Sequence, residues 1–154
     1  MKRGVYIKPR YSTLLNQSVP ARSDDVAKAM ARNFGWTIVP CGDTALNRLG
    51  LSTQIPAVWS YVSNGPYRSY TVDGIKLQFK HTDRKSEIIG LSEKTALVIQ
   101  ALRAIGKGNI TQKDLKKPSG KLSESEKSRL RSEGQRAAAW IYQAIKRICK
   151  GEHQ

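Results

Sequence analysis

The dipeptide Asp73-Gly74 constrains the fold of this chain more than any other feature of its sequence. Asp-Gly is a preferred pair for a two-residue turn in which both residues take positive φ. It stands between two segments rich in strand-forming residues, 67–72 and 75–80, and therefore predicts a β-hairpin. Such a turn sets a register with one apolar and one polar face. The apolar face pairs Val72 with Ile75 and Tyr70 with Leu77, and the polar face carries Ser69, Thr71, Lys76 and Gln78.

Short apolar runs and helix caps predict the other elements before residue 107. Runs at 4–8, 36–40 and 57–62 indicate strands. Apolar residues at helical spacing follow three capping residues, and a glycine ends each helix. The caps are Ser23, Asp43 and Ser92, and the closing glycines are Gly35, Gly50 and Gly106. Gly42-Asp43-Thr44 could instead cradle a phosphate, but the Asp43 carboxylate would repel it, and we expect a helix cap there.

Residues 107–154 are predicted to be helical. Thr111 with Asp114 and Ser123 with Glu126 form capping boxes, the first of them for a short helix that ends before Pro118. A last helix carries an apolar stripe made of Ala137, Trp140, Ile141, Ala144, Ile145 and Ile148. The predicted fold is α/β of the α+β kind: a small mixed or antiparallel sheet with a hairpin, packed helices and a basic helical C-terminal tail. We divide it into a strand and linker at 1–20, a body at 21–106 and a tail at 107–154 packed on the body.

The net charge of the chain indicates an anionic partner. Lys and Arg number 27 against 12 Asp and Glu, which gives a net charge of +15, and such a field attracts polyanions. Nucleic acid is the partner we expect. We expect no membrane partner and a cytoplasmic protein, because no apolar run approaches the ~20 residues needed to cross a bilayer and no apolar signal region follows Met1.

The tail is the denser source of positive charge. Residues 91–154 carry a net charge of +8 (14 minus 6) and the longer segment 1–90 carries +7 (13 minus 6). We therefore predict phosphate contacts in the tail, where the alternative for the lysines around Pro118 and Gly120 is a solvated loop. The candidate nucleic-acid-binding residues are Lys113, Lys116, Lys117, Lys121, Lys127, Arg129, Arg131, Arg136, Lys146, Arg147 and Lys150.

No constellation for catalysis or metal binding is recognisable. Cys41 and Cys149 lie far apart and are predicted to be buried or half-buried thiols. His81 and His153 have no metal-ligand spacing, and no two carboxylates are spaced for acid-base work. We expect no enzyme activity, no metal and no cofactor. We expect core packing, not base stacking, for the aromatic residues Tyr6, Tyr11, Trp59, Tyr61, Tyr67, Tyr70 and Trp140.

One stretch of the body resembles a known family. Residues 39–56 resemble the helix-and-loop signature of AbiEi-type antitoxins of type IV toxin-antitoxin systems, most specifically in the run Leu49 to Pro56. Residues 4–12, the Gly65-Pro66 pair with 75–81, and 97–102 extend the resemblance over most of 3–106. The family-motif residues are Gly42, Asp43, Asn47, Leu49, Gly50, Leu51, Ser52, Thr53, Gln54 and Pro56.

The resemblance implies an antitoxin that counteracts a nucleotidyltransferase toxin without forming a stable complex with it. It also implies an amino-terminal winged helix that represses the operon promoter. This sequence begins where the wing would end and has no room for a recognition helix before Val5. Either the protein is a naturally short form, or the choice of start codon or of the sequence boundary has removed the winged helix. The expected function is thus an antitoxin with a basic surface that contacts operon DNA or the toxin's RNA substrate. The alternatives are a fragment of a transcriptional autorepressor and a general DNA- or RNA-binding protein.

Overall fold

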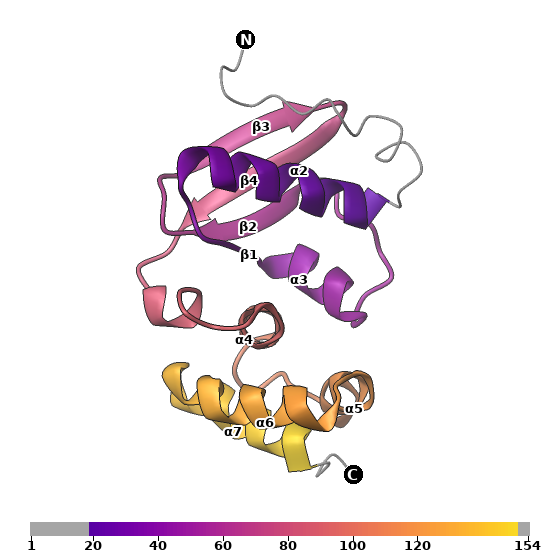
Figure 1. Ribbon diagram of the computed structural model, residues 1–154. Coiled ribbons are helices and arrows are strands. Elements are labelled where there is room, and N and C mark those ends of the chain that lie inside the picture. The colour runs from indigo at the N-terminus through magenta and orange to yellow at the C-terminus, as the bar shows by residue number, and fades with distance from the viewer. Residues whose placement is uncertain (1–18, 151–154) are drawn as a thin grey trace.

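The computed structural model describes residues 19–150, which form six α-helices, four strands and two short 3-10 helices. In chain order these are α2 (Val19–Phe34), β1 (Ile38–Pro40), α3 (Gly42–Leu49), β2 (Trp59–Ser63), β3 (Arg68–Val72), β4 (Ile75–His81), η1 (Lys85–Glu87), α4 (Glu93–Ile105), α5 (Gln112–Lys121), α6 (Glu124–Glu133), η2 (Gly134–Arg136) and α7 (Ala139–Lys150). Figure 1 shows α2 and the sheet at one end, α5 to α7 at the other, and α4 between them. The predicted strand at 4–8, together with Tyr6, Tyr11 and His153, lies outside the described residues.

The four strands form a mixed sheet, which confirms the predicted fold class. Their order is β1-β2-β4-β3, with β2 and β4 parallel and the other two pairs antiparallel. The hairpin has the predicted register, since Val72 pairs with Ile75 and Tyr70 with Leu77. Its turn has φ of 51° at Asp73 and 80° at Gly74, which is the turn geometry that Asp-Gly favours.

Helix α2 covers one face of the sheet. Its buried residues Val26 and Met30 pack with Tyr61 and Phe79 from the two central strands. The prediction that Ser23 caps this helix is wrong, because Ser23 is buried within the helix and its hydroxyl donates to the Pro20 carbonyl at 2.9 Å. Proline is well tolerated in a first helical turn, where backbone N–H groups need no helical partner, so the helix begins four residues earlier than the predicted cap.

Helix α4 joins the sheet to the tail helices. Near its start, Ala96 packs with Val39 of β1 and Ile88. Farther along, Val98 and Leu102 enter a larger core with α3, α5, α6 and α7. The predicted cap holds, since the Ser92 hydroxyl accepts from the Thr95 N–H. The larger core therefore contains side chains of both the predicted body and the predicted tail, whose apolar surface is buried together.

Two predictions about the ends of α3 and α5 are wrong. Asp43 is exposed in the first turn of α3, and Cys41 occupies the cap position without a side-chain bond. The Cys41 N–H still donates to Ser60 of β2 at 3.0 Å, so the helix begins directly where the sheet ends. Helix α5 continues through the buried Pro118 to Lys121, because packing of Pro118 offsets the helical hydrogen bond that proline removes. The lysines around it thus lie on a helix and not in a loop.

Among the residues that the structure describes, the aromatic and cysteine predictions are confirmed with one exception, and those for Tyr6 and Tyr11 stay untested. Trp59 and Tyr61 are buried, Tyr70 is half-buried, and Trp140 packs against the larger core. Tyr67 is 54% exposed, since it precedes β3 and lies outside the alternating pattern. Cys41 is buried, Cys149 is half-buried, and both thiols are free. Between residues 19 and 150, no helix has the length and apolarity to cross a bilayer.

Candidate nucleic-acid interface

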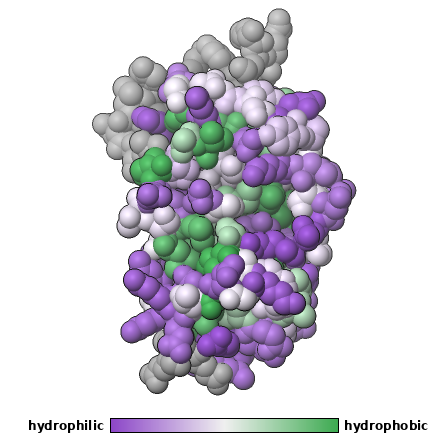
Figure 2. All heavy atoms as spheres, turned by 180° about the vertical axis from the view of Figure 1, so that it is seen from behind, coloured by the Kyte–Doolittle hydropathy of each residue, from purple (hydrophilic) through white to green (hydrophobic). Residues whose placement is uncertain are grey.

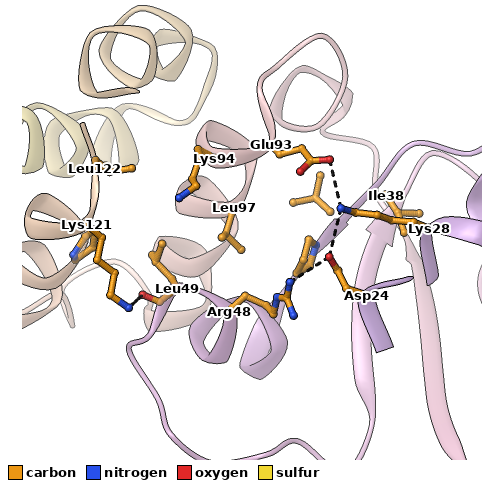
Figure 3. A pocket seen from close by; sticks show the side chains of 13 residues that line it. Asp24, Lys28, Ile38, Arg48, Leu49, Glu93, Lys94, Leu97, Lys121 and Leu122 are labelled. Atoms are coloured by element: carbon orange, nitrogen blue, oxygen red, sulfur yellow. Dashed lines mark hydrogen bonds and ion pairs between the residues drawn. The ribbon is translucent and has the colours of Figure 1, made fainter. Parts of the chain in front are cut away.

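A cleft of about 340 Å³ opens where α2, β1, α3, α4 and α5 meet. Helices α3, α4 and α5 each contribute both apolar and charged side chains to it, β1 adds apolar ones and α2 charged ones (Figure 3). The apolar residues are Ile38, Val39, Pro40, Leu49, Leu97, Pro118 and Leu122, and the charged ones are Asp24, Lys28, Arg48, Glu93, Lys94 and Lys121.

The family-motif residues build the loop beside this cleft. Gly50 ends α3 with a φ of 82°, and the Leu51 N–H donates back to the Leu46 carbonyl at 2.8 Å, a closure that needs a residue free to take positive φ. The Asn47 amide donates to the Gln54 carbonyl at 2.9 Å, and the Gln54 N–H donates to the Ser52 hydroxyl at 3.2 Å. Several motif residues therefore end the helix and hold the loop that follows it in shape. Of its other members, Leu49 is buried, Gly42, Leu51 and Pro56 are half-buried, and Asp43 and Thr53 are exposed.

Two lysines of α5 contact the end of α3. Lys117 donates to the Gly50 carbonyl at 3.1 Å and Lys121 to the Leu49 carbonyl at 3.4 Å. The carboxyl end of a helix carries a partial negative charge that attracts cations. These contacts bring the predicted basic run and the family motif together, although the two are far apart in the sequence.

Three cations of the cleft were missed by sequence reasoning. Lys28, Arg48 and Lys94 each stand on a different helix, α2, α3 and α4. Two carboxylates of the rim engage the first two: Asp24 lies 3.4 Å from Lys28 and 3.2 Å from Arg48, and Glu93 lies 3.5 Å from Lys28. No spacing within the sequence marks these cations, because only the packing of three helices places them together.

The other predicted basic residues do not share one surface. Arg129 lines a second hollow with Lys94, between the starts of α4 and α6. Arg136 serves the fold, since its guanidinium donates to the Ile89 carbonyl at 2.6 Å. Lys127 is only 16% exposed and pairs with Glu124 at 3.8 Å. Lys146 lies over the Tyr142 ring, and Lys113, Lys116, Arg131, Arg147 and Lys150 are exposed.

Cationic side chains outnumber carboxylates around the cleft. Four cations and two carboxylates line the cleft, a formal excess of two positive charges (4 minus 2).

In the part of the chain from 19 to 150, no three side chains of the metal-ligating types gather. Burial raises the pKa of the Cys41 thiol to about 11, so this cysteine stays protonated near neutral pH. Viewed from behind (Figure 2), hydrophilic residues cover most of the surface, with apolar groups gathered between them.

Residues 1–130 match the model of a family described as "Family of unknown function (DUF6088)", and the chain belongs to that family. No curated protein and no solved structure matches the chain.

Proposed function

We propose that this member of the DUF6088 family is an AbiEi-like antitoxin of a type IV toxin-antitoxin system, which counteracts a nucleotidyltransferase toxin through a basic nucleic-acid-binding surface. The observation that carries the proposal is the contact between α5 and the end of α3. There Lys117 and Lys121 reach the carbonyls of Gly50 and Leu49, so the most antitoxin-like stretch of the sequence adjoins a lysine-rich helix.

Charge supports the nucleic-acid part of this proposal. The chain carries +15, and Lys113 and Lys116 on α5 are exposed. Among the described residues no carboxylate lies within 4.0 Å of either ammonium. Free cations on a helix can replace counterions along a phosphate backbone, which releases those ions and drives binding.

The proposed mechanism needs no stable complex with the toxin. A basic surface that covers the nucleic-acid substrate of the toxin opposes it by competition for that substrate. Phosphate contacts of this kind position a protein on a polyanion without reading its sequence. Binding should therefore weaken strongly as the salt concentration rises.

The test is rescue of growth in cells that express the nucleotidyltransferase encoded beside this gene. The variant Lys113→Glu with Lys116→Glu changes two exposed residues of α5. The matched control, Arg32→Glu with Lys76→Glu, changes the net charge equally at exposed positions of α2 and β4. We expect rescue by the wild type and the control, and loss of rescue by the α5 variant.

Two outcomes contradict the proposal. If the folded wild-type chain does not rescue growth, it is not an antitoxin, and retained nucleic-acid binding would make it a general nucleic-acid-binding protein. If the α5 variant and the control rescue equally well, the basic surface of α5 is not the means of neutralisation.

A further inference from the structure

We propose that the cleft between α2, β1, α3, α4 and α5 binds a nucleoside phosphate, either free or as the end of a nucleic-acid strand. This inference deepens the nucleic-acid-binding part of the proposed function and rests on it for its biological setting. The walls and the charges of the cleft support such a site independently.

The size and lining of the cleft suit a small organic anion. Its volume of about 340 Å³ lies at the lower end of the range of about 300–1,000 Å³ for small-molecule sites. Ile38 of β1 and Leu97 of α4 both line it (Figure 3). An apolar wall of this kind can cover the flat face of a base, whereas an inorganic anion would gain nothing from it.

The rim supplies groups for a phosphate. The Arg48 guanidinium is a planar fork of donors that matches two phosphate oxygens, and Lys121 adds a compact charge. The Lys121 ammonium donates to a backbone carbonyl, and no carboxylate of residues 19–150 lies within 4.0 Å of it. Its charge is therefore not neutralised by a carboxylate.

The two carboxylates of the rim have different parts in this site. Asp24 is only 13% exposed, accepts from the Tyr61 hydroxyl at 3.4 Å and pairs with Arg48 at 3.2 Å, so it holds the guanidinium in place. Glu93 is 86% exposed and touches Lys28 at 3.5 Å. An exposed ion pair is weak, and an arriving phosphate can take the place of Glu93 on Lys28.

The experiment follows backbone amide shifts of the full-length chain by NMR during titration with AMP, adenosine and inorganic phosphate. We expect saturable shifts with AMP at residues of the cleft, and much weaker binding of adenosine and of phosphate alone. Arg48→Gln with Lys121→Gln should weaken AMP binding at least about tenfold, because charge-assisted hydrogen bonds are lost. The control Arg32→Gln with Lys76→Gln, at exposed positions of α2 and β4 outside the cleft, should bind AMP as the wild type does.

A variant that should bind AMP more tightly completes the test, because misfolding can weaken binding but cannot tighten it. Glu93→Gln removes the carboxylate that competes for Lys28 and should tighten AMP binding several-fold. The inference is overturned if AMP shifts no residue of the cleft, if the Arg48 and Lys121 variant binds AMP like the wild type, if Glu93→Gln weakens AMP binding, or if phosphate alone binds as tightly as AMP.

A second arm distinguishes the two sources of the ligand. A 5′-phosphorylated oligoadenylate that displaces AMP and binds more tightly identifies a strand end, and equal or weaker binding identifies the free nucleotide. Failure here is separable from failure of the proposed function. Rescue of growth without AMP binding leaves the antitoxin proposal standing and removes the nucleotide site, whereas AMP binding without rescue does the reverse.

Discussion

The side chain of Lys121 occupies the space that a Cβ atom on residue 50 would fill, so that only glycine at this position leaves the lysine where it is. Gly50 also has a φ of 82° at the end of α3. One residue of the family motif thus serves two purposes. It closes a helix, and it lets a cation of α5 approach the Leu49 carbonyl at the edge of the cleft.

The first prediction concerns Gly50→Ala. The left-handed backbone conformation should destabilise the variant by about 1–2 kcal/mol. The contact with Lys121 should add little, because the end of a flexible side chain can move away, but the ammonium would leave the cleft. We expect a lower free energy of unfolding in urea together with weaker AMP binding.

Gly74→Ala is the matched control for this variant. Gly74 has a φ of 80°, and no heavy atom lies within 4 Å of the place of its Cβ atom. It should lose about as much stability as Gly50→Ala, on the order of 1–2 kcal/mol, and keep its affinity for AMP. Equal AMP affinity in the two alanine variants would show that the approach of Lys121 to residue 50 has no part in binding.

The second prediction concerns the ion pair of Glu87 with Arg103. Glu87 is 3% exposed and accepts two hydrogen bonds of 2.7 Å from the Arg103 guanidinium. It also accepts from the Ala138 N–H at 3.3 Å, so it ties η1 to α4 and to the start of α7. Glu87→Ala should cost about 3 kcal/mol, because it leaves a partly buried cation without its partner.

A double-mutant cycle with Arg103→Met measures the pairwise part of this effect. The double variant should be less destabilised than the sum of the two single variants, since neither charge is then left alone. Additive losses of unfolding free energy would show that Glu87 acts through packing and not through the ion pair.

Local signals explain which parts of the fold were predictable from sequence. The turn at Asp73-Gly74 fixes the hairpin register within its own four residues, and the caps at Ser92, Thr111 and Ser123 act over three residues. These features depend on hydrogen bonds between near neighbours. The start of α2 was missed because the burial of Ser23 against other elements, and not its capping propensity, decides its place.

The candidate site depends on packing and was only partly predictable. Lys117 and Lys121 were found because they belong to a dense basic run. Lys28, Arg48 and Lys94 come from three helices and meet only after α4 has packed on α3 and on the sheet. No local sequence pattern predicts that these three side chains lie together. Arg136 is the opposite case. The sequence predicts it as a phosphate contact, but its guanidinium donates to the Ile89 carbonyl within the fold.

The third prediction concerns Gly120→Ala on α5. Gly120 lies in the last turn of the helix, is exposed, and has no heavy atom within 4 Å of the place of its Cβ atom. Alanine there should stabilise the protein by about 0.5–1 kcal/mol, because glycine loses more backbone entropy in a helix. Gly65→Ala is the contrasting variant, since its Cβ atom would run into the Trp36 indole and should lower the melting temperature. A loss of stability in Gly120→Ala would contradict the helical course of α5 beyond Pro118.

The fourth prediction concerns the pH dependence that His81 gives to stability. Its Nδ1 lies 2.9 Å from the Gly65 carbonyl oxygen and its Nε2 lies 3.0 Å from Asp83 Oδ1. The Gly65 carbonyl first, and Asp83 next, raise the pKa of His81 above its usual value. Both acceptors favour the protonated ring, in which both nitrogens donate.

The pKa of His81 is higher in the folded chain than in the unfolded chain, where it is about 6.5. The protonated ring therefore stabilises the folded chain fully below pH ~6.5, and this stabilisation is lost as the pH rises through the pKa of the folded state. The wild type should therefore exceed His81→Gln in unfolding free energy by more at pH 5.5 than at pH 8. Urea unfolding at both pH values measures this difference, and subtracting the variant removes the other titrating groups. NMR titration of the ring should give a pKa above about 6.5, which falls in Asp83→Asn. A ring pKa at or below that value, or a difference that grows toward pH 8, would show that the two acceptors do not hold the proton.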